Sequence, residues 1–139
     1  MDIESSIEAV RKLLYANEHV SAARLFGSAA KGLARSSSDL DVAVVPRAAA
    51  DTVVLDAEYL DLVAQLSLAA GRDVHLILLD RVEPVLGRQV FLDGRTLFDR
   101  DPRRTAAILE RITREYFDGE YHRRMRAAAL DRRDAARNG

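Results

Sequence analysis

Apolar side chains near the N-terminus of this chain recur at helical spacing. The pattern from Ile7 to Leu14 places them on one side of a helix, which predicts a helix over residues 5–16. Ser5 or Ser6 precedes the apolar positions and is suited to cap the first turn. The chain is therefore expected to begin with an amphipathic helix that covers an apolar core.

Short apolar runs follow, and several of them are rich in β-branched residues. Such runs, bounded by glycine, proline or aspartate, are typical of buried strands. They predict three strands and a fourth, edge strand, at residues 22–26, 40–45, 74–79 and 95–98. Because helical segments separate the strands, we expect an α/β fold with a small mixed sheet of three to four strands flanked by helices.

Two of those helical segments lie between the predicted strands. Apolar residues over 55–69 recur at helical spacing, and Gly71 lies where a helix of this length would end. A shorter helix is predicted over 84–94, because a proline suits the first turn and a glycine ends the segment.

The C-terminal segment is helical in pattern and differs from the rest in charge. Residues 1–99 hold 10 basic and 15 acidic side chains, whereas residues 100–139 hold 11 basic residues, all arginine, and 7 acidic ones. The pattern predicts a helix from Asp101 that breaks at Asp118–Gly119. We therefore divide the chain into a core, 1–99, and an arginine-rich segment, 100–139, which is either part of the same domain or an extension that binds a partner.

Composition narrows the classes of protein that this chain can represent. With 139 residues, 48% of them hydrophobic, it forms one globular domain. A net charge of −1 excludes a basic nucleic-acid coat over the whole surface, and the absence of cysteine excludes disulfides and thiolate metal sites. The chain has no apolar run long enough for a membrane span and no signal-peptide pattern at its acidic N-terminus, so the cytoplasm is the expected location.

The segment from residue 25 to 45 contains the residues with the most informative chemistry. Gly27 and Ser28 follow a predicted strand, where a glycine lets the backbone approach a ligand and a serine hydroxyl can bind an anion. Asp39 and Asp41 lie two residues apart at the start of the next strand, so their side chains share one face. Paired carboxylates next to a phosphate site are suited to hold Mg²⁺. Taken singly, Ser28 is typical of a helix cap and the aspartates are typical of solvated side chains, so the metal site is indicated by the combination.

A third carboxylate on an adjacent strand would complete a site for two metal ions. Asp73 opens the predicted strand 74–79 and is the candidate for this role. His75 lies two residues further on the same face, and we interpret it as a half-buried strand histidine. The combination of a phosphate site and three carboxylates is suited to nucleotidyl transfer.

The pair Gly27-Ser28, followed after ten residues by Asp39-Leu40-Asp41, resembles the signature of the minimal nucleotidyltransferases of the polymerase-β-type superfamily. The ten-residue spacing between Ser28 and Asp39 and the length of the chain are most similar to those of the MntA-type antitoxins of HEPN/MNT toxin–antitoxin pairs. This resemblance implies the nucleotidyltransferase fold, ATP and Mg²⁺ as ligands, and transfer of AMP to a tyrosine hydroxyl of a HEPN-domain toxin ribonuclease (HepT-type), which neutralises the toxin.

The resemblance also assigns roles to individual residues. Gly27 and Ser28 would hold the β- and γ-phosphates of ATP. Three carboxylates would ligate the metal and carry the catalysis, namely Asp39, Asp41 and Asp73. Lys31 is expected to contact a phosphate, although a solvated helix charge is the alternative. Among the serines 36–38, Ser38 is the candidate for a further phosphate contact.

Two alternative functions remain open at this point. The chain could transfer a nucleotide to a small molecule or a nucleic acid, but such relatives carry a further substrate-binding domain and only about 40 residues follow the last predicted strand. It could instead be an antitoxin that blocks a toxin by contact alone. The complete set of three aspartates favours the catalytic interpretation.

Overall fold

A computed structural model describes residues 1–35 and 38–138 of the chain. Ser36 and Ser37, two of the serines considered as phosphate contacts, lie outside the described residues. The strands are β1 (Val20–Phe26), β2 (Leu40–Pro46), β3 (Val74–Leu78) and β4 (Arg95–Asp99). The helices are α1 (Ile3–Tyr15), α2 (Gly27–Ala30), α3 (Ala49–Ala57), α4 (Tyr59–Ala70), α5 (Pro84–Asp93) and α6 (Pro102–Asn138).

The four strands form one mixed sheet in the order β3-β2-β1-β4. β1 is antiparallel to both of its neighbours, whereas β2 and β3 are parallel. This confirms the expected α/β class, including a fourth strand at the edge. Because β2 and β3 run in the same direction, the residues that open them lie at the same end of the sheet, next to the carboxyl end of β1.

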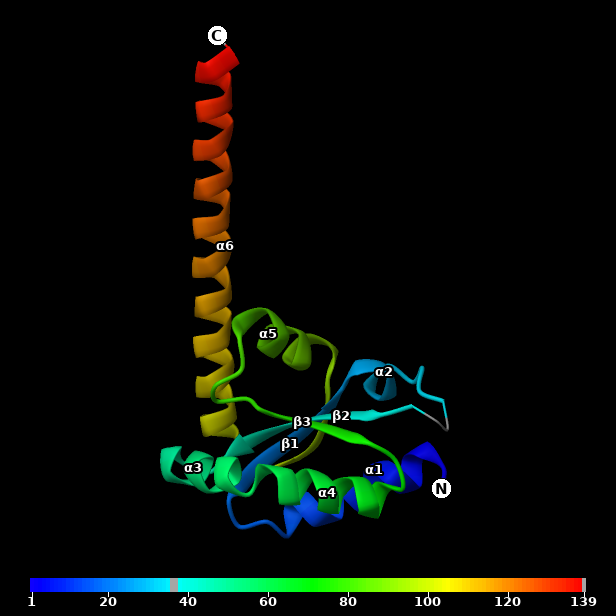
Figure 1. Cartoon of the computed structure of the whole chain (residues 1–139). Coiled ribbons are helices and arrows are strands. Elements are labelled where there is room, and N and C mark those ends of the chain that lie inside the picture. The colour runs from blue at the N-terminus through cyan, green and yellow to red at the C-terminus, as the bar shows by residue number, and fades with distance from the viewer. Residues whose placement is uncertain (36–37, 139) are drawn as a thin grey trace.

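Helices cover both faces of the sheet (Figure 1). Helices α1 and α4 pack on one face through a core of buried aliphatic residues that includes Val10, Leu14 and Leu66. Helix α5 and the first part of α6 pack on the other face, where Val90, Ile112 and other apolar residues form a second core. Strands whose two faces are both covered are apolar throughout, which explains the continuous runs seen in the sequence.

The helix termini differ in detail from the predictions. Helix α1 begins at Ile3, and its cap is Asp2, whose Oδ1 accepts a 2.7 Å hydrogen bond from the Ser5 N–H, so the prediction of Ser5 or Ser6 as the cap is wrong. Ser6 is instead buried and donates a 2.6 Å hydrogen bond to the carbonyl of Ala70 in α4. That bond ties α1 to α4.

The single helix predicted over 55–69 is two helices, α3 and α4, which meet at Glu58. Helix α3 begins at Ala49, and Leu55 is its one buried residue. Because a single residue faces the core, the sequence of α3 shows little helical periodicity. Helix α4 ends as predicted, because Gly71 adopts a φ of +67° that suits glycine at a helix C-terminus.

The break predicted at Asp118–Gly119 is also wrong, because α6 is one helix of 37 residues. A glycine inside a helix costs only about 1 kcal/mol relative to alanine, which does not by itself end a helix. Ile108 and Ile112 of α6 are buried against the sheet, whereas the C-terminal half of α6 extends away from the domain (Figure 1). None of the helices in the described ranges combines the length and the apolarity needed to cross a bilayer.

A partly buried ion pair joins the loop before β1 to helix α3. The Nδ1 of His19 lies 2.8 Å from Asp51 Oδ1, and its Nε2 lies 3.5 Å from Glu18 Oε1. The hydrogen bond to Asp51, with the negative charges of Glu18 and Glu58 nearby, raises the pKa of His19 above its usual value. Folding therefore favours the protonated imidazole.

This pair makes the stability of the fold depend on pH. Its contribution is complete below about pH 6.5 and is lost as the pH rises through the raised pKa of His19. We expect the urea midpoint of the native chain to fall more between about pH 6 and pH 8 than that of His19→Gln, which cannot be protonated. Equal declines for the two proteins would show that His19 does not stabilise the fold in this way.

Candidate active site

The predicted site residues meet at the end of the sheet where β2 and β3 begin and β1 ends. In the register of the sheet, Phe26 of β1 lies beside Asp41 of β2, and Asp41 lies beside His75 of β3. Gly27 and Ser28 follow Phe26 directly as the start of α2. The topology thus brings the Gly-Ser pair and the Asp-x-Asp pair together, as the sequence predicted.

Gly27 and Asp41 are in close contact. Gly27 has a φ of +71°, a conformation that side chains other than glycine rarely adopt. A Cβ on this residue would lie 2.3 Å from Asp41 Oδ2, so the carboxylate occupies the space that a side chain would need. Ser28 comes next and is exposed within α2 rather than capping it. The backbone at Gly27 and the Asp41 carboxylate are therefore in contact, and Ser28 is the next residue along the chain.

His75 lies between the two aspartates. Its Nδ1 is 3.2 Å from Asp41 Oδ1, and its Nε2 is 3.4 Å from Asp39 Oδ2. The His75 side chain is 62% exposed, so the interpretation as a half-buried strand histidine is wrong. Sequence reasoning placed His75 on the correct face but did not assign it to the aspartate pair, because the register between β2 and β3 is not visible in the sequence.

Asp73 lies just before β3, one position earlier than the first paired residue, Val74. Its backbone carbonyl accepts a 3.0 Å hydrogen bond from the N–H of Leu40 and fixes the start of the parallel pair. Its side chain is exposed. The role of Asp73 as third carboxylate stays a prediction, and the strand position beside Asp41 belongs to His75.

The two remaining candidates are engaged in other interactions. The Nζ of Lys31, at the end of α2, lies 3.7 Å from Asp93 Oδ2 at the end of α5. The hydroxyl of Ser38 accepts a 2.8 Å hydrogen bond from the backbone N–H of Arg35. Arg72 in turn donates to the carbonyls of Arg35 and Ser38 at 3.2 Å each. Arg35 and Ser38 are thus both bound to Arg72, which lies shortly before β3.

The donor set at this end of the sheet fits a hard divalent cation. Asp39 and Asp41 are 46% and 30% exposed, and each has one carboxylate oxygen that does not face His75. Mg²⁺ binds through one or two carboxylates together with substrate phosphates and water, so two such oxygens are sufficient. Among residues 1–35 and 38–138, no group of three or more His, Cys, Asp or Glu is arranged to hold a metal ion without a further ligand. The chain thus supplies part of a metal site, which the phosphates of a bound nucleotide would complete.

In a comparison with protein families, residues 8–103 match the family described as polymerase beta, nucleotidyltransferase. That range includes all of the strands and every candidate residue of the site. A comparison with curated protein sequences gives no match.

Solved structures share the fold. One chain, from the crystal structure of a toxin–antitoxin with AMP-PNP, has a TM-score of 0.72 and 24% identity over 89% of this chain and 97% of its own. A chain from the toxin–antitoxin MntA-HepT has a TM-score of 0.67 and 22% identity over 91% and 97%. A third, from a tri-AMPylated Shewanella oneidensis HEPN toxin in complex with an MNT antitoxin, has a TM-score of 0.68 and 21% identity over 93% and 98%. At these identities the likeness shows a common fold.

Proposed function

Because this chain belongs to the polymerase-beta nucleotidyltransferase family, we propose that it is an ATP-dependent adenylyltransferase that acts as the antitoxin of a HEPN-domain toxin. The reaction would transfer AMP from ATP to a tyrosine hydroxyl of the toxin and so neutralise it. The observation that carries this proposal is the contact of the Asp41 carboxylate with Gly27, next to Ser28. It joins a phosphate-binding turn and a carboxylate pair in one place.

The proposed reaction is a substitution at the α-phosphorus of ATP. The acceptor oxygen forms a bond to the α-phosphorus, and the bond from that phosphorus to the oxygen bridging to the β-phosphate breaks. Pyrophosphate leaves with the bonding electrons, and the proton of the hydroxyl is lost to a base. Ser28, which is exposed, and the backbone at Gly27 would bind the β- and γ-phosphates of the leaving group.

Asp39 and Asp41 would hold Mg²⁺ at this site. When bound, the cation would neutralise phosphate charge and favour ionisation of the acceptor hydroxyl. Through that cation, the aspartates would fix the position of the triphosphate relative to the Gly27–Ser28 turn. The contact between Gly27 and Asp41 supports this arrangement, because it sets the distance between the two halves of the site.

The acceptor is expected on another protein. Only α6 follows the sheet, and its first part is packed against α5, so the chain has no separate acceptor domain among residues 1–35 and 38–138. The structures with the same fold described as complexes with a HEPN toxin, one of them AMPylated, support a HEPN partner for this chain. We expect a neighbouring reading frame to encode such a protein.

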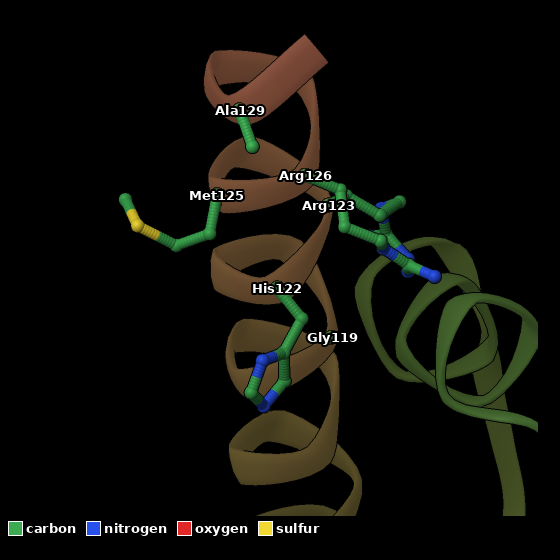
Figure 2. A pocket seen from close by; sticks show the side chains of 6 residues that line it. All are labelled: Gly119, His122, Arg123, Met125, Arg126 and Ala129. Atoms are coloured by element: carbon green, nitrogen blue, oxygen red, sulfur yellow. The ribbon is translucent and has the colours of Figure 1, made fainter. Parts of the chain in front are cut away.

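The exposed part of α6 is our candidate docking surface for this partner. Tyr121 and Met125 are 59% and 46% exposed on a helix that has left the domain. Figure 2 shows that Met125 points to one side of the helix and that Arg123 and Arg126 point to the other. Exposed aromatic and methionine side chains of this kind can anchor an interface.

Truncation after Gly119 tests this docking surface. We expect the apparent KM for the HEPN partner to rise about tenfold or more, since apolar anchors of this kind contribute roughly 1–2 kcal/mol each. Binding of ATP should stay unchanged, because the nucleotide site lies at the far end of the sheet. An unchanged KM would place the interface at the loops around the active site instead.

The function itself is tested by label transfer. The chain, Mg²⁺ and the HEPN-domain protein from the neighbouring reading frame are incubated with ATP labelled at either the α- or the γ-phosphate. We expect the α-label alone to appear on the partner, and peptide mapping to place it on a tyrosine. Transfer of the γ-label would indicate a kinase, and no transfer with a stable complex would favour an antitoxin that acts by contact alone.

A further inference from the structure

We propose that His75, rather than Asp73, is the third side chain of this site, and that it acts as a positioning residue for the two metal-binding aspartates. This inference rests on the proposed function, because it concerns how Asp39 and Asp41 are held for a cation and a nucleotide. It replaces the third carboxylate with an imidazole that touches both carboxylates.

The register of the sheet supports this assignment. In the parallel pair β2–β3, Asp41 and His75 are partners, so their side chains leave the same face of the sheet side by side. Asp73 precedes the first pair, Leu40 and Val74, and fixes it through its backbone carbonyl. The strand position next to the inner aspartate is therefore filled by a histidine.

The contacts of the ring show what His75 can do. Its two nitrogens lie 3.2 Å from Asp41 Oδ1 and 3.4 Å from Asp39 Oδ2, so one ring faces one oxygen of each carboxylate. The shorter contact is a hydrogen bond to Asp41. The other oxygen of Asp41, Oδ2, lies on the Gly27 side, 2.3 Å from the place of a Cβ. His75 and Gly27 thus hold this carboxylate from opposite sides, with Oδ2 directed toward the Gly27–Ser28 turn.

A carboxylate held in this way loses little freedom when it binds a cation. Side chains that hydrogen-bond a metal ligand from outside commonly change metal affinity by about 10–100-fold when they are removed. An imidazole is a weak partner for Mg²⁺ itself, which prefers oxygen, so a role through the aspartates suits the chemistry of this cation. His75 would therefore act on metal affinity without being a ligand.

The test uses Mn²⁺ as a spectroscopic substitute for Mg²⁺. The ion is added to the isolated chain together with a non-hydrolysable ATP analogue, and binding is measured by the loss of the EPR signal of the free ion. We expect His75→Leu to weaken Mn²⁺ binding about 10–100-fold with an unchanged melting temperature. His75→Asn should restore most of the affinity, because its amide nitrogen can take the place of Nδ1 and donate to Asp41. Asp73→Asn, which changes the residue just before β3, is the competing variant and should weaken Mn²⁺ binding less than His75→Leu does.

Three results would overturn the inference. His75→Leu could bind Mn²⁺ as tightly as the native chain, Asp73→Asn could lose more affinity than His75→Leu, or pulsed EPR could show nitrogen of His75 directly bound to Mn²⁺. Each of these leaves the native chain binding metal and nucleotide, so the proposed function would stand. A native chain that binds neither would contradict the proposed function itself.

Discussion

Asp41→Asn is expected to abolish transfer of AMP while leaving the fold intact. The change removes the charge that a divalent cation requires but keeps the shape of a side chain that lies between Gly27 and His75. We expect the rate of label transfer to fall by at least about 10³-fold, which corresponds to about 4 kcal/mol of transition-state stabilisation. The measurement is transfer of α-labelled AMP to the HEPN partner under single-turnover conditions.

A matched control is Asp61→Asn, which alters an exposed carboxylate in the first turn of α4, remote from this end of the sheet. It should transfer AMP at the native rate. The melting temperature of Asp41→Asn should equal or exceed that of the native chain, since one of two neighbouring negative charges is removed. A folded Asp41→Asn protein with native activity would show that Asp41 is not part of the catalytic machinery.

Gly27→Ala is expected to have the second largest effect, by displacing Asp41. An alanine Cβ would lie 2.3 Å from Asp41 Oδ2, so the carboxylate must rotate away. Displacement of a reacting or ligating group by about 1 Å can reduce the rate about 100-fold, and we expect at least this loss. A positive φ also destabilises alanine by roughly 1–2 kcal/mol, so the variant should unfold at a lower urea concentration.

Gly32→Ala separates these two effects. Gly32 has the same φ of +71°, but a Cβ there would meet no atom within 4 Å. It should therefore show the same loss of stability as Gly27→Ala, with native activity. Similar activities for the two variants would mean that the contact between Gly27 and Asp41 does not matter for the reaction.

The sequence predicted the location of this site because its residues lie close together along the chain. Gly27 and Asp41 are close along the chain, and the antiparallel pairing of β1 and β2 brings the end of β1 next to the start of β2. The strands were recognisable because both faces of the sheet are covered and the runs are apolar throughout. The family expected from these residues is confirmed by the match over residues 8–103.

Contacts across the sheet were not predictable in the same way. If the register between β2 and β3 were shifted by one residue, a neighbour of His75 would lie beside Asp41 in its place. The local sequence does not fix that register. The sequence therefore indicates Asp73 by residue type alone, whereas the structure places the imidazole of His75 beside Asp41. His19 likewise meets Asp51, a residue 32 positions away, only through tertiary packing.

The continuity of α6 was missed for a different reason. Gly119 and Asp118 are weak helix formers, but the surrounding residues favour a helix, and an ion pair between Glu120 and Arg124 spans the next turn at 2.7 Å. Local propensity summed over many residues outweighs one unfavourable glycine. The result is an exposed helical arm instead of two separate helices, which strengthens the case for a docking surface.

The central claim, that Gly27, Ser28 and the two aspartates form one metal-dependent nucleotide site, is tested most directly by calorimetric titration of the isolated chain. The titrant is a non-hydrolysable ATP analogue, with Mg²⁺ and again with excess EDTA. We predict binding at one site in the presence of Mg²⁺ and a loss of affinity of at least about tenfold without it, because the carboxylates then repel the triphosphate. Equal affinity under both conditions, or no binding with Mg²⁺ present, would contradict the account.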